Sequence, residues 1–138
     1  MSKVLYLIRG VPGSGKSTLA QKMSSELNIN FYEADMWMND VDGNYKFDPT
    51  RLTHCHRKCQ QEVCWQMMRG HDVIVSNTFI KKWEADVYYA LAKVWDYEVK
   101  VVLCEGNYAN VHGVPQDRVN IMRSNMEPYE NQTIYKEA

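Results

Sequence analysis

The sequence lacks a long apolar run, a strong charge of either sign and any cysteine pair of the Cys-x-x-Cys type. Its longest apolar stretch runs from Val4 to Ile8 and ends at Arg9, whereas a helix that crosses a bilayer needs about 20 apolar residues. We therefore expect neither a membrane span nor a signal peptide. Sixteen basic and seventeen acidic side chains give a net charge of −1, so any contact with nucleic acid must be local.

The four cysteines are scattered along the chain, at Cys55, Cys59, Cys64 and Cys104. Because a domain of this size needs no disulfides, we expect reduced thiols and a cytoplasmic protein. Cys55 and Cys59 share one face of a predicted helix with Val63, which indicates core positions rather than zinc ligands.

The composition, with 45% hydrophobic and 24% charged residues among 138, is typical of one globular domain spanning residues 1–138. Short apolar runs alternate with helical periodicity, which predicts an α/β fold: a parallel sheet of four or five strands with helices on both faces. The expected strands are residues 4–8, 31–34, 73–75 and 99–103, with a fifth near 132–135. The expected helices are residues 16–27 and 51–69, a third marked by Trp83, Val87, Leu91 and Val94, and a fourth that starts at Pro115 and turns Val119, Met122 and Met126 inward.

Residues 10–17 read Gly-Val-Pro-Gly-Ser-Gly-Lys-Ser and match the pattern G-x-x-x-x-G-K-[ST] of a phosphate-binding loop. The match follows a predicted strand and opens a predicted helix, a context that a chance glycine-rich turn does not have. Lys16 is predicted to neutralise the β and γ phosphates of ATP, and the Ser17 hydroxyl to bind Mg²⁺. The residues predicted to bind the nucleotide are Gly10, Pro12, Gly13, Ser14, Gly15, Lys16, Ser17 and Thr18.

Polar side chains follow the other predicted strands, at the edge where an open parallel sheet binds its ligands. Asp35 follows the second strand, Asn77 and Thr78 follow the third, and Glu105 follows the fourth. We predict that Asp35 is a general base that orients an acceptor hydroxyl, the alternative being a turn-capping aspartate. Trp37 is predicted to stack on a base or sugar, or else to pack in the core. The predicted substrate-binding set is Asp35, Trp37, Asn77 and Thr78.

Several further segments occur in an order that resembles a known family. After the phosphate loop come residues 31–35 (Phe-Tyr-Glu-Ala-Asp), 42–49 (Asp-Gly-Asn-Tyr-Lys-Phe-Asp-Pro), 73–78 (Val-Ile-Val-Ser-Asn-Thr) and 110–115 (Asn-Val-His-Gly-Val-Pro). Together they resemble the polynucleotide-kinase-like and zeta-toxin-like group of P-loop kinases, which includes the 5'-hydroxyl polynucleotide kinases of bacteriophages. The resemblance extends to about Glu127.

This resemblance implies the P-loop NTPase fold, with the strands in the spatial order second, third, first, fourth. It also implies that Lys16 and Ser17 hold ATP and Mg²⁺, that Asp35 activates an acceptor hydroxyl, and that residues 107–115 form a lid over the nucleotide.

The sequence departs from the phage enzymes of this group at three places. Met38 stands where they carry an arginine that grips a phosphate of the acceptor strand, and Asn77 stands where they carry an acidic residue. Ala109 and Asn110 stand where arginines enter their lid.

The last predicted helix carries two arginines that can supply positive charge to the transferred phosphoryl group. Arg118 and Arg123 flank its apolar stripe, and either is a catalytic candidate if that helix packs beside the site. The alternative is that both are solvated helix arginines.

The predicted reaction is transfer of the γ phosphate of ATP to a hydroxyl, most simply the 5'-hydroxyl of a polynucleotide or nucleoside. A small metabolite, such as a sugar or a nucleotide sugar, is the alternative acceptor. Lysines and arginines near the cleft favour the polynucleotide, whereas a run of aspartates favours the small acceptor; the basic residues are Lys46, Arg51, Arg57 and Lys58, and the acidic ones Asp35, Asp40, Asp42 and Asp48. The rival from another class is a nucleotide-binding module that has lost catalysis and acts as a switch or inhibitor.

Overall fold

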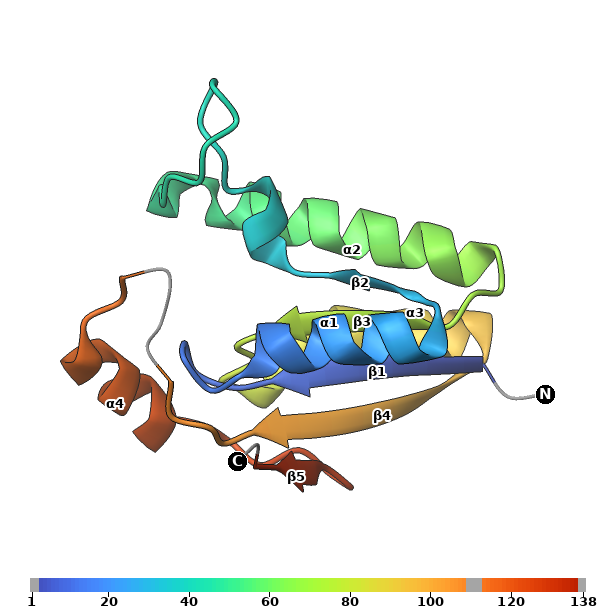
Figure 1. Ribbon diagram of the computed structural model, residues 1–138. Helices are drawn as coiled ribbons and strands as arrows, with labels where there is room; N and C mark the ends of the chain where they lie inside the picture. Colours follow the sequence, from blue (N-terminus) through green and yellow to red (C-terminus); the bar gives the residue numbers. More distant parts are fainter. Residues whose placement is uncertain (1–2, 109–112, 137–138) are drawn as a thin grey trace.

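The computed structural model describes residues 3–108 and 113–136, and its centre is one five-stranded parallel sheet (Figure 1). The strands are β1 (Lys3–Arg9), β2 (Asn30–Tyr32), β3 (Val73–Asn77), β4 (Tyr97–Cys104) and β5 (Thr133–Tyr135). They lie in the order β2-β3-β1-β4-β5, and every neighbouring pair is parallel. This confirms the predicted α/β class and strand order, and adds the fifth strand beside β4.

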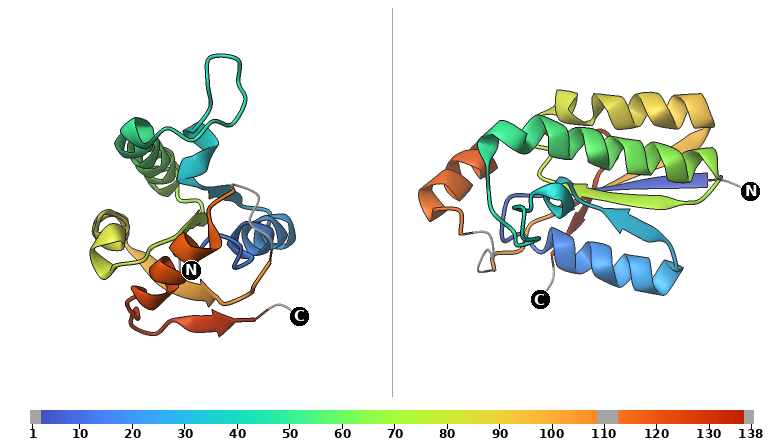
Figure 2. Two further views of the ribbon diagram at one scale, coloured as in Figure 1. Left: turned by 90° about the vertical axis from the view of Figure 1, so that its left-hand side faces the viewer. Right: turned by 90° about the horizontal axis from the view of Figure 1, so that it is seen from above.

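The central strand β1 is apolar on both faces because both faces are covered. Leu5 and Leu7 are buried in the larger core, on the side of α2 (Leu52–Met68) and α3 (Asp86–Trp95). Ile8 is buried in the smaller core, on the side of α1 (Lys16–Leu27). Figure 2 shows these helices on opposite sides of the sheet. A strand that is buried on both faces reads as a continuous apolar run, as the sequence of β1 does.

The fourth helix, α4 (Gln116–Ser124), lies beyond the carboxyl ends of the strands rather than against a face of the sheet (Figures 1 and 2). Pro115 caps it, and Val119 is buried, whereas Met122 and Met126 are only half-buried. Three short 3₁₀ turns complete the fold: η1 (Ala34–Trp37), η2 (Pro49–Arg51) and η3 (Lys82–Ala85). No helix in the described parts of the chain has the length and apolar character that a membrane crossing requires.

The structure corrects the predicted face of the third helix. Of the predicted stripe only Leu91 packs against the core, whereas Trp83 and Val94 are 70% and 71% exposed. The buried residues of the helix are Tyr88 and Ala92. The ring of Tyr88 meets Phe79 edge-on, with 5.7 Å between the ring centroids. Apolar residues occur on both sides of this helix, so the sequence pattern alone did not identify the buried side.

The second predicted strand is shorter than expected. It ends at Tyr32, and Ala34 already belongs to η1, so Asp35 lies in a 3₁₀ turn and not at a strand end. A turn at Asp42-Gly43 closes a short hairpin: Gly43 has a φ of 83°, and an antiparallel bridge joins Asn39 to Tyr45. The hairpin projects from the carboxyl edge of the sheet (Figure 1).

Candidate functional site

The glycine-rich loop between β1 and α1 has the conformation that its motif predicts. Gly13 and Gly15 have φ values of 82° and 93°, which L side chains rarely adopt. Gly15 is also the N-cap residue of α1, and no side chain caps this helix start. The first main-chain N–H groups of α1 therefore remain available for an anion.

Two neighbouring segments hold the loop in place through main-chain hydrogen bonds. On one side, the N–H of Gly10 donates to the carbonyl of Thr78, at 3.2 Å. On the other, the N–H groups of Gly106 and Tyr108 donate to the carbonyls of Ser14 and Gly13, at 3.0 and 2.7 Å. The loop is thus fixed before any ligand binds, and preorganisation of this kind favours affinity.

One buried polar atom in the loop fits a phosphate ligand. Ser14 is 3% exposed, and its hydroxyl has no hydrogen-bond partner among the described residues. A buried hydroxyl without a partner is costly, and a phosphate oxygen is a strong acceptor. The loop therefore fits the triphosphate that its sequence predicts.

Lys16, Ser17 and two acidic residues form the charged part of the site. The Ser17 hydroxyl donates to Glu33 Oε2 at 2.6 Å. Burial lowers the pKa of Lys16, and the neighbouring carboxylates of Glu33 and Asp35 oppose that shift. A hydroxyl and carboxylates are the oxygen donors that Mg²⁺ prefers, so the residues present fit this ion. Thr18, the next residue of α1, is exposed.

Glu33 is a site residue that the sequence reasoning missed. It follows β2 directly and is the N-cap residue of η1. The expected strand extended to Ala34, which hid Glu33 inside a strand when it is in fact the first residue beyond one. Its place at the carboxyl edge of the sheet was the available signal.

Asn77 supports the turn that carries Asp35. Its Oδ1 accepts the N–H of Ala34 at 2.9 Å, and its Nδ2 approaches Cys59 Sγ at 3.9 Å. Both ends of the buried amide are therefore engaged by the protein. Thr78 contributes its carbonyl to the phosphate loop through the bond to Gly10.

Trp37 and Met38, at the end of η1, pack toward the protein interior, whereas Met36 is exposed. Trp37 is half-buried and stacks on Tyr32, with the ring centroids 6.4 Å apart. Met38, immediately after the turn, is fully buried. The hairpin brings Tyr45 back to the site, where burial and then the charge of Asp35 raise the pKa of the Tyr45 phenol. Asp35 thus lies among Lys16, the hairpin and the start of α2.

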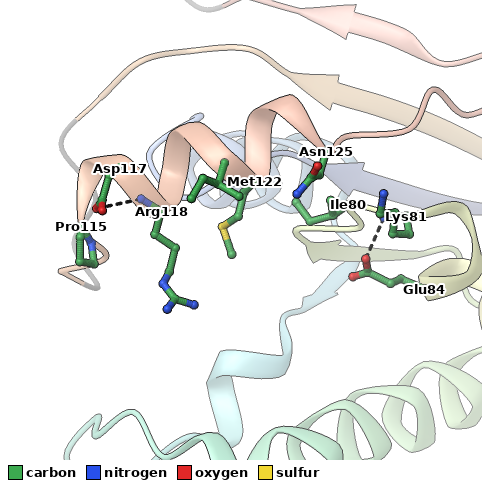
Figure 3. Close-up of a pocket in the computed structure, with 9 residues that line it drawn as sticks. Ile80, Lys81, Glu84, Pro115, Asp117, Arg118, Met122 and Asn125 are labelled. Atoms are coloured by element: carbon green, nitrogen blue, oxygen red, sulfur yellow. Dashed lines mark hydrogen bonds between the residues drawn. The ribbon is translucent and has the colours of Figure 1, made fainter.

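The two candidate arginines of α4 lie in different places. A pocket of about 500 Å³ separates α4 from the loop after β3; Figure 3 shows the residues that line it, which are Ile80, Lys81, Glu84, Pro115, Asp117, Arg118, Ile121, Met122 and Asn125. Arg118 belongs to this lining, whereas Arg123 does not and is exposed. The expected lid falls partly outside the described residues, because it includes residues 109–112.

A second residue that sequence reasoning missed is Arg9, which ends β1 and is fully buried. Its guanidinium donates to the carbonyl of Phe79 from Nε and Nη2, at 3.0 and 2.6 Å, and to Gln132 Oε1 from Nη1, at 2.7 Å. It also lies 3.8 Å from the centroid of the Tyr129 ring. Arg9 therefore ties the end of β1 to the loop after β3 and to the chain before β5.

The sheet has this strand order and a phosphate loop after its central strand, and the first residues of α1, Lys16 and Ser17, lie beside two carboxylates that follow β2. These features define the class of P-loop small kinases. The family comparison agrees. The chain belongs to the family AAA_33, described as an AAA domain, whose model matches residues 5–132.

Individual relatives are distant. The chain is 28% identical over 136 residues to human NEDD4-binding protein 2, covering 86% of this chain and 7% of that protein, so it spans only a small part of the relative's length. Its fold is similar to a sugar kinase from a Janibacter species, with a TM-score of 0.67, 18% identity, and coverage of 99% of this chain and 86% of that one. It is also similar to a chain of the Pnkp1/Rnl/Hen1 RNA repair complex, with a TM-score of 0.63, 15% identity, and coverage of 88% and 36%. At these identities the structural likeness shows the fold alone.

Proposed function

We propose that this protein transfers the γ phosphate of ATP to a hydroxyl group, and that the acceptor is the 5'-hydroxyl of a polynucleotide or nucleoside. The observation that carries the proposal is the juxtaposition of Lys16, Ser17, Glu33 and Asp35. It joins a preformed phosphate loop to a carboxylate that faces the same lysine.

In this reaction the acceptor oxygen forms a bond to the γ phosphorus, while the bond from that phosphorus to the oxygen bridging it to the β phosphate breaks. The proton of the acceptor hydroxyl passes to the carboxylate of Asp35. Lys16 and the main-chain N–H groups of the loop hold the negative charge of the phosphates. Ser17 and Glu33 would hold Mg²⁺, which when bound supplies further neutralisation of the β and γ phosphates.

The fold neighbours support both acceptor classes, because one is a sugar kinase and the other is part of an RNA repair complex. The polynucleotide reading also rests on the sequence segments shared with polynucleotide-kinase-like enzymes. A sugar or another small metabolite remains the alternative acceptor.

A second candidate function is a nucleotide-binding module without catalysis. It is favoured by Asn77, which brings no charge to the end of β3 and whose amide is engaged by Ala34 and Cys59. In this case the protein binds ATP, and Asp35 has no catalytic role.

The deciding experiment gives the protein γ-labelled ATP with either a 5'-hydroxyl oligonucleotide or a pool of small metabolites, and follows the label. The matched variants are Asp35→Asn and Asp42→Asn, the second being an exposed aspartate at the hairpin tip. We expect Asp35→Asn to lower kcat by about 10²–10⁴-fold while ATP affinity is retained, because only proton acceptance is removed. Asp42→Asn should match the wild type.

Two results would contradict the proposal. If the wild type binds ATP but transfers label to neither acceptor, the module without catalysis is the better account. If Asp35→Asn transfers label as fast as Asp42→Asn, then Asp35 is not the base.

A further inference from the structure

The outer side of α3 carries an apolar stripe that no other element of the described ranges 3–108 and 113–136 covers. Val87, Ala90 and Val94 are exposed on the helix itself, and the exposed Trp83 precedes them in η3. Figure 2 shows α3 at the outer edge of the molecule, on the side of the sheet opposite α1. We refer to these four residues as the α3 seam.

The seam has the spacing of a contact between paired helices. Steps of four, three and four residues separate its members, which is the a/d spacing of a coiled coil. The buried residues Tyr88 and Ala92 lie on the other side of the helix. The sheet therefore covers one apolar side of α3, and the seam is a second one that is suited to another helix.

Two exposed charges of opposite sign lie on one flank of the seam. Asp86 is in the first turn of α3 and Lys93 is in its last turn. Because seven residues separate them, they lie about two turns apart on the same flank of the helix. In the part of the chain that the structure describes, neither side chain belongs to an ion pair.

A second copy of α3 that runs antiparallel is complementary to these charges. A two-fold axis in the contact plane, perpendicular to the helix, brings the same flank of both copies together. Asp86 of one copy then lies opposite Lys93 of the other, and symmetry forms this pair twice. In a parallel pair this flank would meet the opposite flank, which carries Leu91 at that level, and neither ion pair would form.

The antiparallel arrangement also fits the apolar side chains. Trp83 of one copy faces Val94 of the other, and Val87 faces the small Ala90. Large side chains thus lie opposite smaller ones, which allows the two helices to interdigitate. The dipoles of antiparallel helices attract each other, whereas those of parallel helices repel.

We propose that the α3 seam is a self-association surface, on which two copies of this chain pair antiparallel about a two-fold axis. The occupant is a second copy because both the apolar pattern and the charges are complementary to themselves. Two short helices form a small interface, below about 1,200 Å² in total, so we expect a weak dimer with a dissociation constant of about 10–100 µM. This inference is independent of the proposed function, since the seam contains no residue of the nucleotide site.

Charge reversal tests the antiparallel pairing. Asp86→Lys places like charges at both ionic contacts of the dimer, and so does Lys93→Asp. We expect each variant alone to raise the dissociation constant about ten-fold or more, because two attractive pairs become repulsive. An equimolar mixture of the two variants should dimerise as the wild type does, and so should the doubly reversed variant. Sedimentation equilibrium at protein concentrations from about 10 µM to 1 mM measures the association.

The mixture is the decisive arm, because Asp86 and Lys93 also suit the dipole of α3 within one molecule. A single reversal removes that benefit as well, but only contact between molecules allows one variant to restore the other. Wild-type dimerisation of either variant alone, or no recovery in the mixture, would overturn the proposed pairing.

Val94→Ser tests the apolar part of the seam. Its matched control is Leu27→Ser, which replaces an exposed aliphatic side chain at the end of α1, on the other face of the sheet. We expect Val94→Ser to raise the dissociation constant about ten-fold, because each dimer loses two buried side chains, and Leu27→Ser to leave it unchanged. Equal effects of the two substitutions, or a wild type that stays monomeric up to about 1 mM, would overturn the proposal.

Discussion

At the scale of single residues, burial and neighbouring carboxylates act in opposite directions on the charge of Lys16. Burial lowers the pKa of its ammonium group, and the carboxylates of Glu33 and Asp35 partly reverse that shift. In the folded protein without ligand, Lys16 therefore loses its proton at a lower pH than a free lysine, for which the pKa is 10.5. A bound triphosphate would restore the proton, because its negative charge favours the ammonium form.

The affinity for ATP should therefore decrease at alkaline pH. Because nucleotide binding takes up a proton at Lys16, ATP affinity should fall as the pH rises through the lowered pKa of this lysine, below 10.5. The unfolded chain holds the proton more tightly over the same window, so the contribution of Lys16 to the free energy of unfolding should rise there. Calorimetric ATP titrations between neutral and alkaline pH measure the first effect.

Lys16→Met is the control, since it should bind ATP weakly and without this alkaline decline. An affinity that is flat up to the pH where free lysine titrates would contradict the prediction.

The buried contacts of Arg9 should make a large contribution to the free energy of unfolding. Replacing it with methionine keeps the approximate length of the side chain but leaves the Phe79 carbonyl and Gln132 without their donor and removes the stacking on Tyr129. We expect Arg9→Met to lower the free energy of unfolding by about 3 kcal/mol, since buried groups without partners cost about 1–3 kcal/mol each. Urea denaturation measures this loss.

Lys3→Met is a matched control, because Lys3 is an exposed cation at the other end of β1. It should change the free energy of unfolding by less than about 1 kcal/mol. A comparable loss in the two variants would mean that the Arg9 contacts are unimportant.

The residues of the site were predictable to different degrees. Lys16 and Ser17 belong to a contiguous motif, in which local backbone geometry dictates the residue types. Glu33 was not predicted because its role depends on where β2 ends, and strand ends are poorly marked in a sequence. Arg9 was not predicted because its partners, Phe79 and Gln132, are 70 and 123 residues away.

At the scale of elements, α3 shows why a helical pattern does not always identify a buried face. The stripe that includes Trp83 and Val87 has helical spacing, but so does the stripe of Tyr88 and Ala92. The sheet selects the second stripe because alanine permits close approach and the Tyr88 ring packs against Phe79. The buried face of α2 was predictable because Cys55, Cys59, Val63 and Met67 recur at helical spacing, and all four are buried.

The orientation of α3 can be tested with two substitutions. Tyr88→Ala removes a buried ring and should lower the free energy of unfolding by about 3–5 kcal/mol. Trp83→Ser removes a larger side chain, but one that is 70% exposed, and should cost less than about 1 kcal/mol. Chemical denaturation of both variants measures the difference, and a larger loss for Trp83→Ser would mean that the sequence-based face was right.

At the scale of the whole molecule, the order of the parallel strands brings the phosphate loop, η1 and α4 to one edge. The order was predictable from the resemblance to P-loop kinases, and the alternating pattern gave the fold class without it. The pocket was not predictable, because it forms between residues near 80 and residues near 118, which no local pattern connects. Distances of that kind are set by packing, and the sequence shows only the separate elements.

The nearly neutral charge of the whole molecule limits how strongly salt should weaken its binding to an oligonucleotide. For a single strand, the logarithm of the association constant falls linearly with the logarithm of the salt concentration. The slope is about −0.7 for each phosphate that the protein neutralises. The net charge is −1, and of the basic residues near the cleft Arg51 already donates to the Asn39 carbonyl at 2.6 Å, which leaves Lys46, Arg57 and Lys58. If these three side chains contact phosphate, binding of a 5'-hydroxyl oligonucleotide should have a slope of about −2.1. Fluorescence anisotropy at increasing KCl concentration measures the slope, and Arg57→Met should reduce it by about a third. A slope several times steeper, unchanged in that variant, would place the strand on an extended basic surface instead, and the acceptor would then be recognised mainly by its length.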